Sequence, residues 1–117
     1  MMGRNQADIT GLVGQYAHGN EPSHYMSYLY NMVDKPYKSQ KMVNTILNKM
    51  YSTNPSGIIG NEDCGQMSAW YVLSSIGLFD VNPGDPYYLI QTPLFKQITL
   101  KYITVKKLFN TLTYLEK

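Results

Sequence analysis

Apolar side chains in residues 38–51 recur at the spacing of one helical face, and this stripe constrains the fold more than any other feature of the sequence. The intervening positions are mainly polar, so the segment is predicted to form an amphipathic α-helix with one buried face. The stripe consists of Met42, Val43, Ile46, Leu47, Met50 and Tyr51. A stripe this wide needs a large apolar partner surface, which other helices or another chain must supply.

Two other segments have a strong helical pattern. Residues 25–33 place aromatic and aliphatic side chains three and four positions apart. Residues 64–76 form the other helix, with Asp63 and Gln66 spaced as a capping box and Gly77 as the stop signal. The central part of this helix is apolar nearly all round, which is typical of a helix in the middle of a larger structure.

The two ends of the chain are predicted from weaker patterns. Residues 9–17 have apolar positions at helical spacing and are predicted as a short helix, although two glycines weaken the pattern. Residues 87–91 and 97–102 are predicted as short strands that pair in a hairpin around residues 92–94. Residues 103–117 fit either a strand or a helix.

Together these segments predict a mainly α fold of three to four helices, followed by a short β-hairpin or β appendix. The expected division is a helical part in residues 1–78, a small β segment in residues 79–105 and a tail in residues 106–117. Because the helices present more apolar surface than three helices can cover, we expect the chain to be a fragment or to need a partner.

Composition excludes several classes of function. The chain has 117 residues and a net charge of only +2, which argues against nucleic acid or an anionic membrane as its partner. Cys64 is the only cysteine, so an internal disulfide or a cysteine-based zinc site is excluded. The sequence has no apolar run of about 20 residues to span a membrane, and its first residues do not form a signal peptide.

Two polar stretches stand directly before predicted helices. One contains Asn20 and Glu21, and the other contains Asn61, Glu62 and Asp63. Paired carboxylates are the apparatus of glycoside hydrolysis, and clusters of oxygen ligands suit a hard cation such as calcium. The residue types also have plainer interpretations, because Asp63 is a typical helix N-cap and Glu21 a typical first-turn residue.

Four other residues with reactive or aromatic side chains have structural interpretations. His18 and His24 do not have the spacing of a metalloprotease pair and are expected to be hydrogen-bonding loop residues. Trp70 lies inside an apolar helix and is expected in the core. Cys64 has no neighbouring cation to lower its pKa and is a weak candidate nucleophile.

The two polar stretches also carry a resemblance to a known family. Residues 14–24 read Gly-Gln-Tyr-Ala-His-Gly-Asn-Glu-Pro-Ser-His, and residues 60–71 read Gly-Asn-Glu-Asp-Cys-Gly-Gln-Met-Ser-Ala-Trp-Tyr. In this order they resemble glycoside hydrolase family 92, the calcium-dependent, inverting exo-α-mannosidases. The resemblance covers about residues 8–102 of the sequence.

The resemblance implies a two-domain enzyme with an N-terminal β-sandwich and a C-terminal (α/α)6 barrel. The chain then corresponds to a C-terminal fragment that holds the last barrel helices and the strands after them. The β-sandwich, the rest of the barrel and the general acid would lie upstream of Met1, so the isolated chain is expected to be inactive on its α-mannoside glycan substrate. Full-length relatives are expected to be secreted or periplasmic, whereas this chain carries no signal of its own.

By the same resemblance, Asp63 is the expected general base that activates water, supported by Asn61 and Glu62. Asn20 and Glu21 are the expected ligands near calcium, the implied cofactor. His18 and His24 are expected near the hydroxyl groups of the sugar. Some family members carry Asp where Asn61 stands, and many carry a second His where Tyr25 stands.

Three rival interpretations follow from the same residues. A binding module could retain the calcium and carbohydrate contacts without catalysis, as a lectin does. A structural or interaction protein could use the exposed helix faces to dock a partner chain. A different (α/α)6 glycosidase could act on glucosides.

Overall fold

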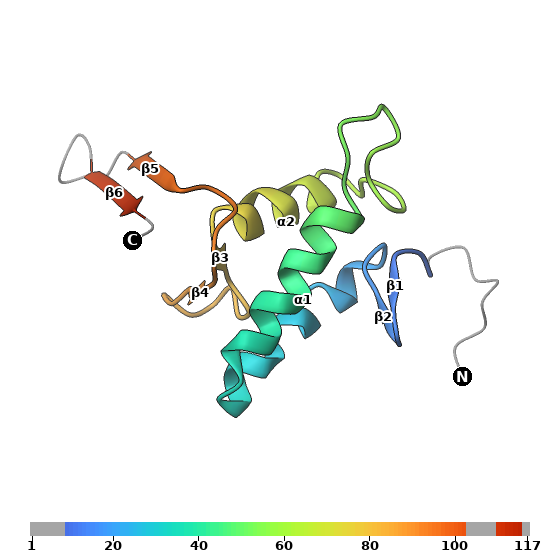
Figure 1. Cartoon of the computed structure of the whole chain (residues 1–117), viewed down its shortest axis with the longest axis horizontal. Helices are drawn as coiled ribbons and strands as arrows, with labels where there is room; N and C mark the ends of the chain where they lie inside the picture. Colours follow the sequence, from blue (N-terminus) through green and yellow to red (C-terminus); the bar gives the residue numbers. More distant parts are fainter. Residues whose placement is uncertain (1–8, 103–109, 116–117) are drawn as a thin grey trace.

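The computed structural model describes residues 9–102 and 110–115. Three helical elements form the centre of the chain, and three two-stranded antiparallel sheets surround them (Figure 1). In chain order, the elements are β1 (Leu12–Val13), β2 (Tyr16–Ala17), η1 (Glu21–Ser23), η2 (Met26–Val33), α1 (Pro36–Lys49), α2 (Gln66–Ser75), β3 (Leu78–Phe79), β4 (Leu89–Ile90), β5 (Gln97–Tyr102) and β6 (Asn110–Leu115).

The apolar stripe predicted in residues 38–51 is confirmed by α1, which spans Pro36–Lys49. The helix begins two residues earlier than predicted because Pro36 occupies its first turn, where a missing backbone N–H costs nothing. Met50 closes the helix by donating its N–H to the carbonyl oxygen of Ile46 at 2.9 Å. The buried face of α1 packs against η2 and α2.

The helix predicted in residues 25–33 forms the 3-10 helix η2, Met26–Val33. It ends at Asp34, whose backbone is left-handed with a φ of 55°. The helix predicted in residues 64–76 forms α2, Gln66–Ser75, and Gly77 follows it with a φ of 80°, as a helix stop does. The predicted start of this helix, with Asp63 as its cap, is wrong.

The short helix predicted in residues 9–17 is also wrong, because this segment forms the hairpin β1–β2. Leu12 pairs with Ala17 and Val13 with Tyr16, which leaves a two-residue turn that begins at Gly14. Gly14 has a φ of 62°, the positive value that this tight turn requires at its first central position. The tight turn at Gly14 therefore outweighed the weak helical spacing of the apolar residues, and the segment forms a hairpin.

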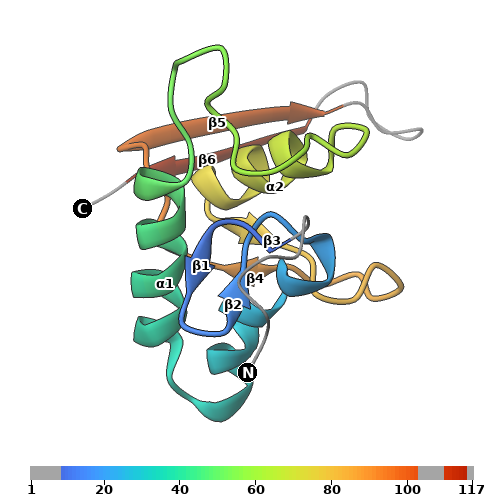
Figure 2. The same ribbon diagram turned by 90° about the vertical axis from the view of Figure 1, so that its right-hand side faces the viewer.

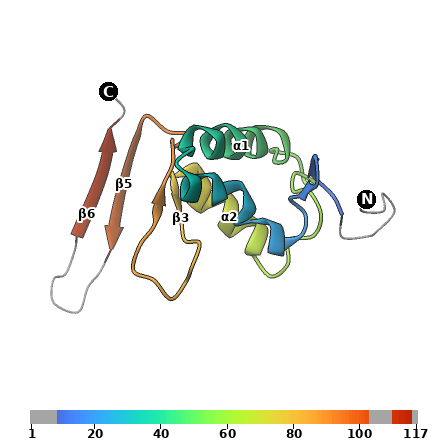
Figure 3. The same cartoon turned by 90° about the horizontal axis from the view of Figure 1, so that it is seen from below.

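The strands β4 and β5 were predicted in place but paired incorrectly, and β3 was not predicted. β4 pairs with β3, and β5 pairs with β6 in the register Gln97↔Leu115 to Tyr102↔Asn110. A hairpin between residues 87–91 and 97–102 is therefore wrong, and so is a helix through residues 110–115. In Figures 1 and 3 the β5–β6 ribbon projects away from the helices. The boundaries of the three expected parts of the chain stay predictions.

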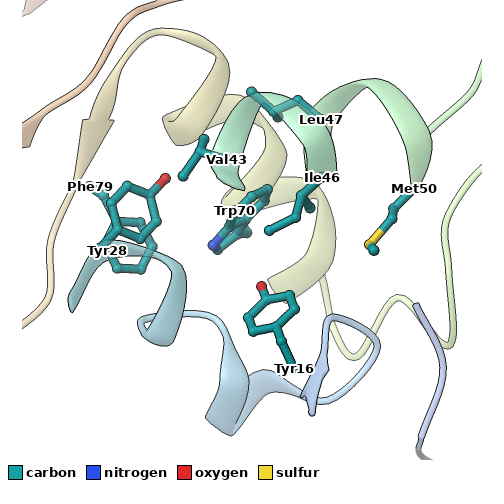
Figure 4. Packing of buried hydrophobic residues seen from close by; sticks show 8 residues of the cluster. All are labelled: Tyr16, Tyr28, Val43, Ile46, Leu47, Met50, Trp70 and Phe79. Carbon is teal, nitrogen blue, oxygen red and sulfur yellow. The ribbon is translucent and has the colours of Figure 1, made fainter. Parts of the chain in front are cut away.

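The core combines aromatic side chains with the apolar face of α1, and Trp70 of α2 lies among them (Figure 4). Trp70 is 2% exposed, which confirms its expected place in the core. The rings of Tyr28 and Phe79 stack with centroids 3.9 Å apart, and the hydroxyl groups of Tyr28 and Ser74 hydrogen-bond at 2.5 Å. Burial raises the pKa of Tyr28, so this hydroxyl stays neutral. The core thus joins η2, α1, α2 and β3.

Several large apolar side chains of η2 and α1 remain on the surface. Met32 and Val33 are each 59% exposed, and Tyr37 is 61% exposed. This agrees with the prediction that the helices present more apolar surface than the chain covers. No helix in residues 9–102 or 110–115 is long and apolar enough to cross a membrane.

We predict that Trp70→Ala lowers the free energy of unfolding by about 3–5 kcal/mol, because it removes the largest side chain of the core. Val72→Ala is the matched control on the same helix; its side chain is 56% exposed, so the loss should be about 0.5 kcal/mol or less. Urea denaturation followed by circular dichroism measures both values. Equal losses would show that the core is not centred on Trp70.

Candidate active site

A polar pocket of about 270 Å³ lies where the two predicted polar stretches meet. Both stretches lie at the same end of the helical core, beside the β1–β2 hairpin and before α2 (Figures 1 and 2). The residues that line the pocket are Thr10, Gly19, Asn20, Glu21, Gly60, Asn61 and Asp63. Four of the seven site residues expected from the sequence are therefore brought together.

Backbone hydrogen bonds hold the first stretch in place. The N–H of His18 donates to the carbonyl oxygen of Gly11 at 3.0 Å, and that of Gly19 donates to Thr10 at 3.1 Å. These bonds continue the β1–β2 hairpin by two more residues, so the chain arrives at the pocket in a fixed direction. Glu21 is the first residue of the 3-10 turn η1. The ring of Pro22, which follows it, fixes the φ angle of residue 22.

The second stretch reaches the pocket through an unusual backbone. Asp63, Cys64 and Gly65 are all left-handed, with φ values of 51°, 58° and 92°. For Asp63 and Cys64 this conformation costs about 1–2 kcal/mol each. It delays the start of α2 to Gln66 and leaves Asp63 at the pocket instead of at the helix cap. Strain of this kind is found at functional sites more often than elsewhere.

Glu62 takes over the capping role that the sequence assigned to its neighbour. The N–H of Ser68 donates to Glu62 Oε1 at 3.1 Å, and the N–H of Met67 donates to the carbonyl oxygen of Glu62 at 3.2 Å. The side chain of Glu62 is therefore bound to the first turn of α2 and does not line the pocket. Asn61, the residue before Glu62, does line the pocket.

The carboxyl groups of Glu21 and Asp63 are hydrogen-bonded across the pocket. The hydrogen bond with Asp63 is the largest of the effects that hold the pKa of Glu21 below its ordinary value. Because an ionised carboxylate only accepts hydrogen bonds, the two groups are hydrogen-bonded when one of them carries a proton. The pair joins the two polar stretches directly.

His18 lies behind the pocket and is completely buried. The hydroxyl of Tyr51 donates to the carbonyl oxygen of Met67 at 3.1 Å, so its oxygen accepts the Nε2–H of His18 at 2.6 Å. His18 Nδ1 then accepts from the hydroxyl of Tyr16 at 2.7 Å. Desolvation, and then repulsion by His24, lowers the pKa of His18 to about 3, so the ring is neutral.

His24 is also buried, at 3% exposure, and its Nε2–H donates to the carbonyl oxygen of His18 at 3.0 Å. Its ring lies 4.9 Å from that of His18 and 5.8 Å from that of Trp70. Desolvation lowers the pKa of His24 as well. Neither histidine lines the pocket, so their geometry matches the structural interpretation, and contact of either with a sugar stays a prediction.

The oxygen atoms around the pocket are of the type that calcium prefers. Carboxylate, amide and hydroxyl oxygens are hard ligands, and Glu21, Asp63, Asn20, Asn61 and Thr10 carry them. Within the described residues, no group of three or more His, Cys, Asp or Glu side chains could hold a metal ion. The donor chemistry therefore fits calcium, with amide, ligand and water oxygens needed to complete its six to eight ligands.

Three residues of the pocket were not expected from the sequence. Gly19 and Gly60 stand inside the two motifs, each directly before an asparagine, and a glycine at such a place is a signal of close approach. Thr10 had no such signal, because it lies in a segment whose predicted structure was wrong.

Comparison with known proteins gives a consistent result. The sequence profile of the glycosyl hydrolase family 92 catalytic domain matches residues 1–113, beyond residue 102 where the resemblance was expected to end. A protein of Arthroderma benhamiae named an uncharacterized secreted glycosidase is 34% identical over 84 residues, which are 72% of this chain and 11% of that protein.

Two solved structures resemble the fold. One is a family GH92 α-mannosidase from Bacteroides thetaiotaomicron in complex with mannoimidazole, with a TM-score of 0.75 and 47% identity over 79% of this chain and 12% of that chain. The other is a family GH92 inverting mannosidase from Bacteroides thetaiotaomicron VPI-5482, with a TM-score of 0.68 and 47% identity over 74% and 12%. The chain spans little more than a tenth of the length of these relatives.

We predict that acid destabilises the fold through the buried histidines. Between pH 6.5 and about 3 the unfolded chain binds a proton at His18 that the folded chain excludes, so the free energy of unfolding falls as the pH falls. The loss approaches about 1.4 kcal/mol per pH unit at most for one histidine. Urea denaturation between pH 7 and 5 measures the slope in this window.

His18→Gln is the variant that isolates this effect. It removes one titrating group and retains His24, so the dependence on pH should become shallower. An identical slope in the wild type and the variant would contradict the assignment.

Proposed function

The chain belongs to glycosyl hydrolase family 92, and from this premise we propose that it forms one wall of the active site of an inverting exo-α-mannosidase. The substrate would be a glycan with a terminal α-linked mannose. One structural relative is named an inverting mannosidase, and another was solved with mannoimidazole. The observation that carries the proposal is the single pocket in which Asp63 and Glu21 meet from distant parts of the sequence.

In the proposed reaction, Asp63 is the general base. Its carboxylate takes a proton from water, the water oxygen attacks the anomeric carbon, and the glycosidic C–O bond breaks as a general acid protonates the leaving oxygen. Attack from the face opposite the leaving group inverts the anomeric configuration. The strained backbone at Asp63 supports this role, because it holds the carboxyl group at the pocket and away from α2.

Glu21 is too close to Asp63 to be that general acid. The two carboxyl groups of an inverting glycosidase are about 6.5–9.5 Å apart, because the attacking water must fit between base and sugar. Glu21 and Asp63 are hydrogen-bonded instead. We therefore place the general acid in a part of the catalytic domain that this chain does not include, which agrees with the much greater length of the relatives.

Glu21 and Asn20 are the residues that we expect to hold calcium, together with oxygens from Asn61 and a bound ligand. A calcium ion would supply a positive charge that orients adjacent sugar hydroxyl groups. Glu21 supports this role because its pKa is lowered, so its carboxylate is ionised near neutral pH. The pocket also holds Asp63, which lies close enough to Glu21 to affect its pKa.

The proposed architecture is an (α/α)6 barrel to which η2, α1 and α2 contribute three helices. The exposed apolar side chains of η2 support it, since neighbouring barrel helices would cover them. Residues of the missing β-sandwich and barrel would complete the pocket. The name of the Arthroderma benhamiae relative supports secretion of the complete protein.

A calcium- and carbohydrate-binding module without catalysis is the second candidate. The described residues favour it in one respect, because their hydrogen-bonded carboxyl pair lacks a second acid at catalytic distance. Such a module would bind mannose derivatives and leave their glycosidic bonds intact.

The test is a chimera in which residues 9–102 replace the matching segment of the Bacteroides thetaiotaomicron α-mannosidase, which is 47% identical. The chimera should hydrolyse an aryl α-mannoside, and Asp63→Asn should lower its kcat about 10²–10⁴-fold. Asn suits this change because it tolerates a left-handed backbone. Asp85→Asn, in an exposed loop, is the control and should leave kcat unchanged.

Two results would count against the enzyme. A folded chimera that binds mannoimidazole without turnover would favour the binding module. A kcat unchanged by Asp63→Asn would show that another residue is the base.

A further inference from the structure

The hydroxyl group of Thr10 lies at the seam between the two loops that form the pocket. Thr10 lines the pocket, yet its Oγ1 is buried and has no hydrogen-bond partner within the described residues. A buried hydroxyl group without a partner destabilises a fold, because it loses its hydrogen bonds to water and gains none. Its retention therefore needs an explanation, and the position in the pocket indicates that a ligand completes it.

Both flanking loops have glycine where they pass this hydroxyl group. A Cβ atom at Gly19 would lie 1.9 Å from Thr10 Oγ1, and one at Gly60 would lie 3.0 Å from it. A side chain at Gly19 would therefore displace the hydroxyl group, and one at Gly60 would press on it. The backbone also fixes residue 10, because the N–H of Gly19 donates to its carbonyl oxygen at 3.1 Å. The hydroxyl group is thus held at the seam with little freedom to leave.

The chemistry of Thr10 complements that of the acidic pair. An ionised Glu21 only accepts hydrogen bonds, whereas a threonine hydroxyl group both donates and accepts. A sugar hydroxyl group has the same double character, so it can donate to the Glu21 carboxylate and accept from Thr10 Oγ1. A ligand without a hydroxyl group at that position would leave the Thr10 oxygen unpaired, which is a strong basis for discrimination.

Resting on the proposed function, we propose that Thr10 is a specificity-determining residue of the pocket, whose hydroxyl group hydrogen-bonds a hydroxyl group of the bound sugar. Gly19 and Gly60 serve this role by leaving room for it. Asp63 and Glu21 come from the recognised motifs, whereas Thr10 enters the site through the β1–β2 hairpin.

The test uses the chimera described above, here called the wild type when residue 10 is Thr, with calcium present and mannoimidazole as the probe, and affinity is measured by calorimetry. Thr10→Val keeps the shape and removes the hydroxyl group, so binding should weaken roughly 5–10-fold, the value of one hydrogen bond. Thr10→Ser keeps the hydroxyl group and should bind within about twofold of the wild type. Without ligand, Thr10→Val should melt at or above the temperature of the wild type, because it removes an unpaired buried polar atom.

Three results would overturn the proposal, and each contradicts a different part of it. Equal affinity of the wild type and Thr10→Val would overturn the role of Thr10 alone and leave the proposed function intact. A lower melting temperature of unliganded Thr10→Val would show that the hydroxyl group holds the fold instead. No binding of mannoimidazole by the folded wild-type chimera would overturn the proposed pocket function and, with it, the role of Thr10.

Discussion

The structure depends on one buried imidazole. His18 is hydrogen-bonded on both ring nitrogens, to Tyr16 in the β1–β2 hairpin and to Tyr51 after α1, and Tyr51 in turn donates to Met67 in α2. Three segments that are distant in the sequence are therefore joined through one side chain. This neutral ring therefore helps to fix the loop that carries Glu21 relative to the loop that carries Asp63. The pocket lies between those two loops.

Burial and capping distinguish the titratable side chains that support the fold from those that line the pocket. Desolvation keeps His18 and His24 neutral behind the pocket, and Glu62 is bound to the first turn of α2. The acidic side chains that line the pocket are Glu21 and Asp63. A pocket lined by side-chain oxygen atoms suits a cation and a polyol, which agrees with membership of a family of glycosidases.

The sequence predicted the local, strongly periodic parts and failed where distant contacts or special backbone angles decided the structure. The stripe of α1 was correct to within two residues at each end, because burial of that face fixes the helix. The cap at Asp63 was wrong because three successive left-handed residues leave no trace in hydrophobic spacing. The pairing of β5 with β6 depends on residues beyond any local window. The meeting of the two polar stretches was predicted, whereas Thr10 was not.

The most direct measurement is the pKa of the Glu21 carboxyl group. Nuclear magnetic resonance titration measures it in the wild type and in Asp63→Gly. Glycine suits this change because the backbone of Asp63 has a φ of 51°. If the two loops meet as described, the pKa of Glu21 lies below its ordinary value in the wild type and rises in the variant. The same pKa in both proteins would show that the two carboxyl groups do not share a pocket.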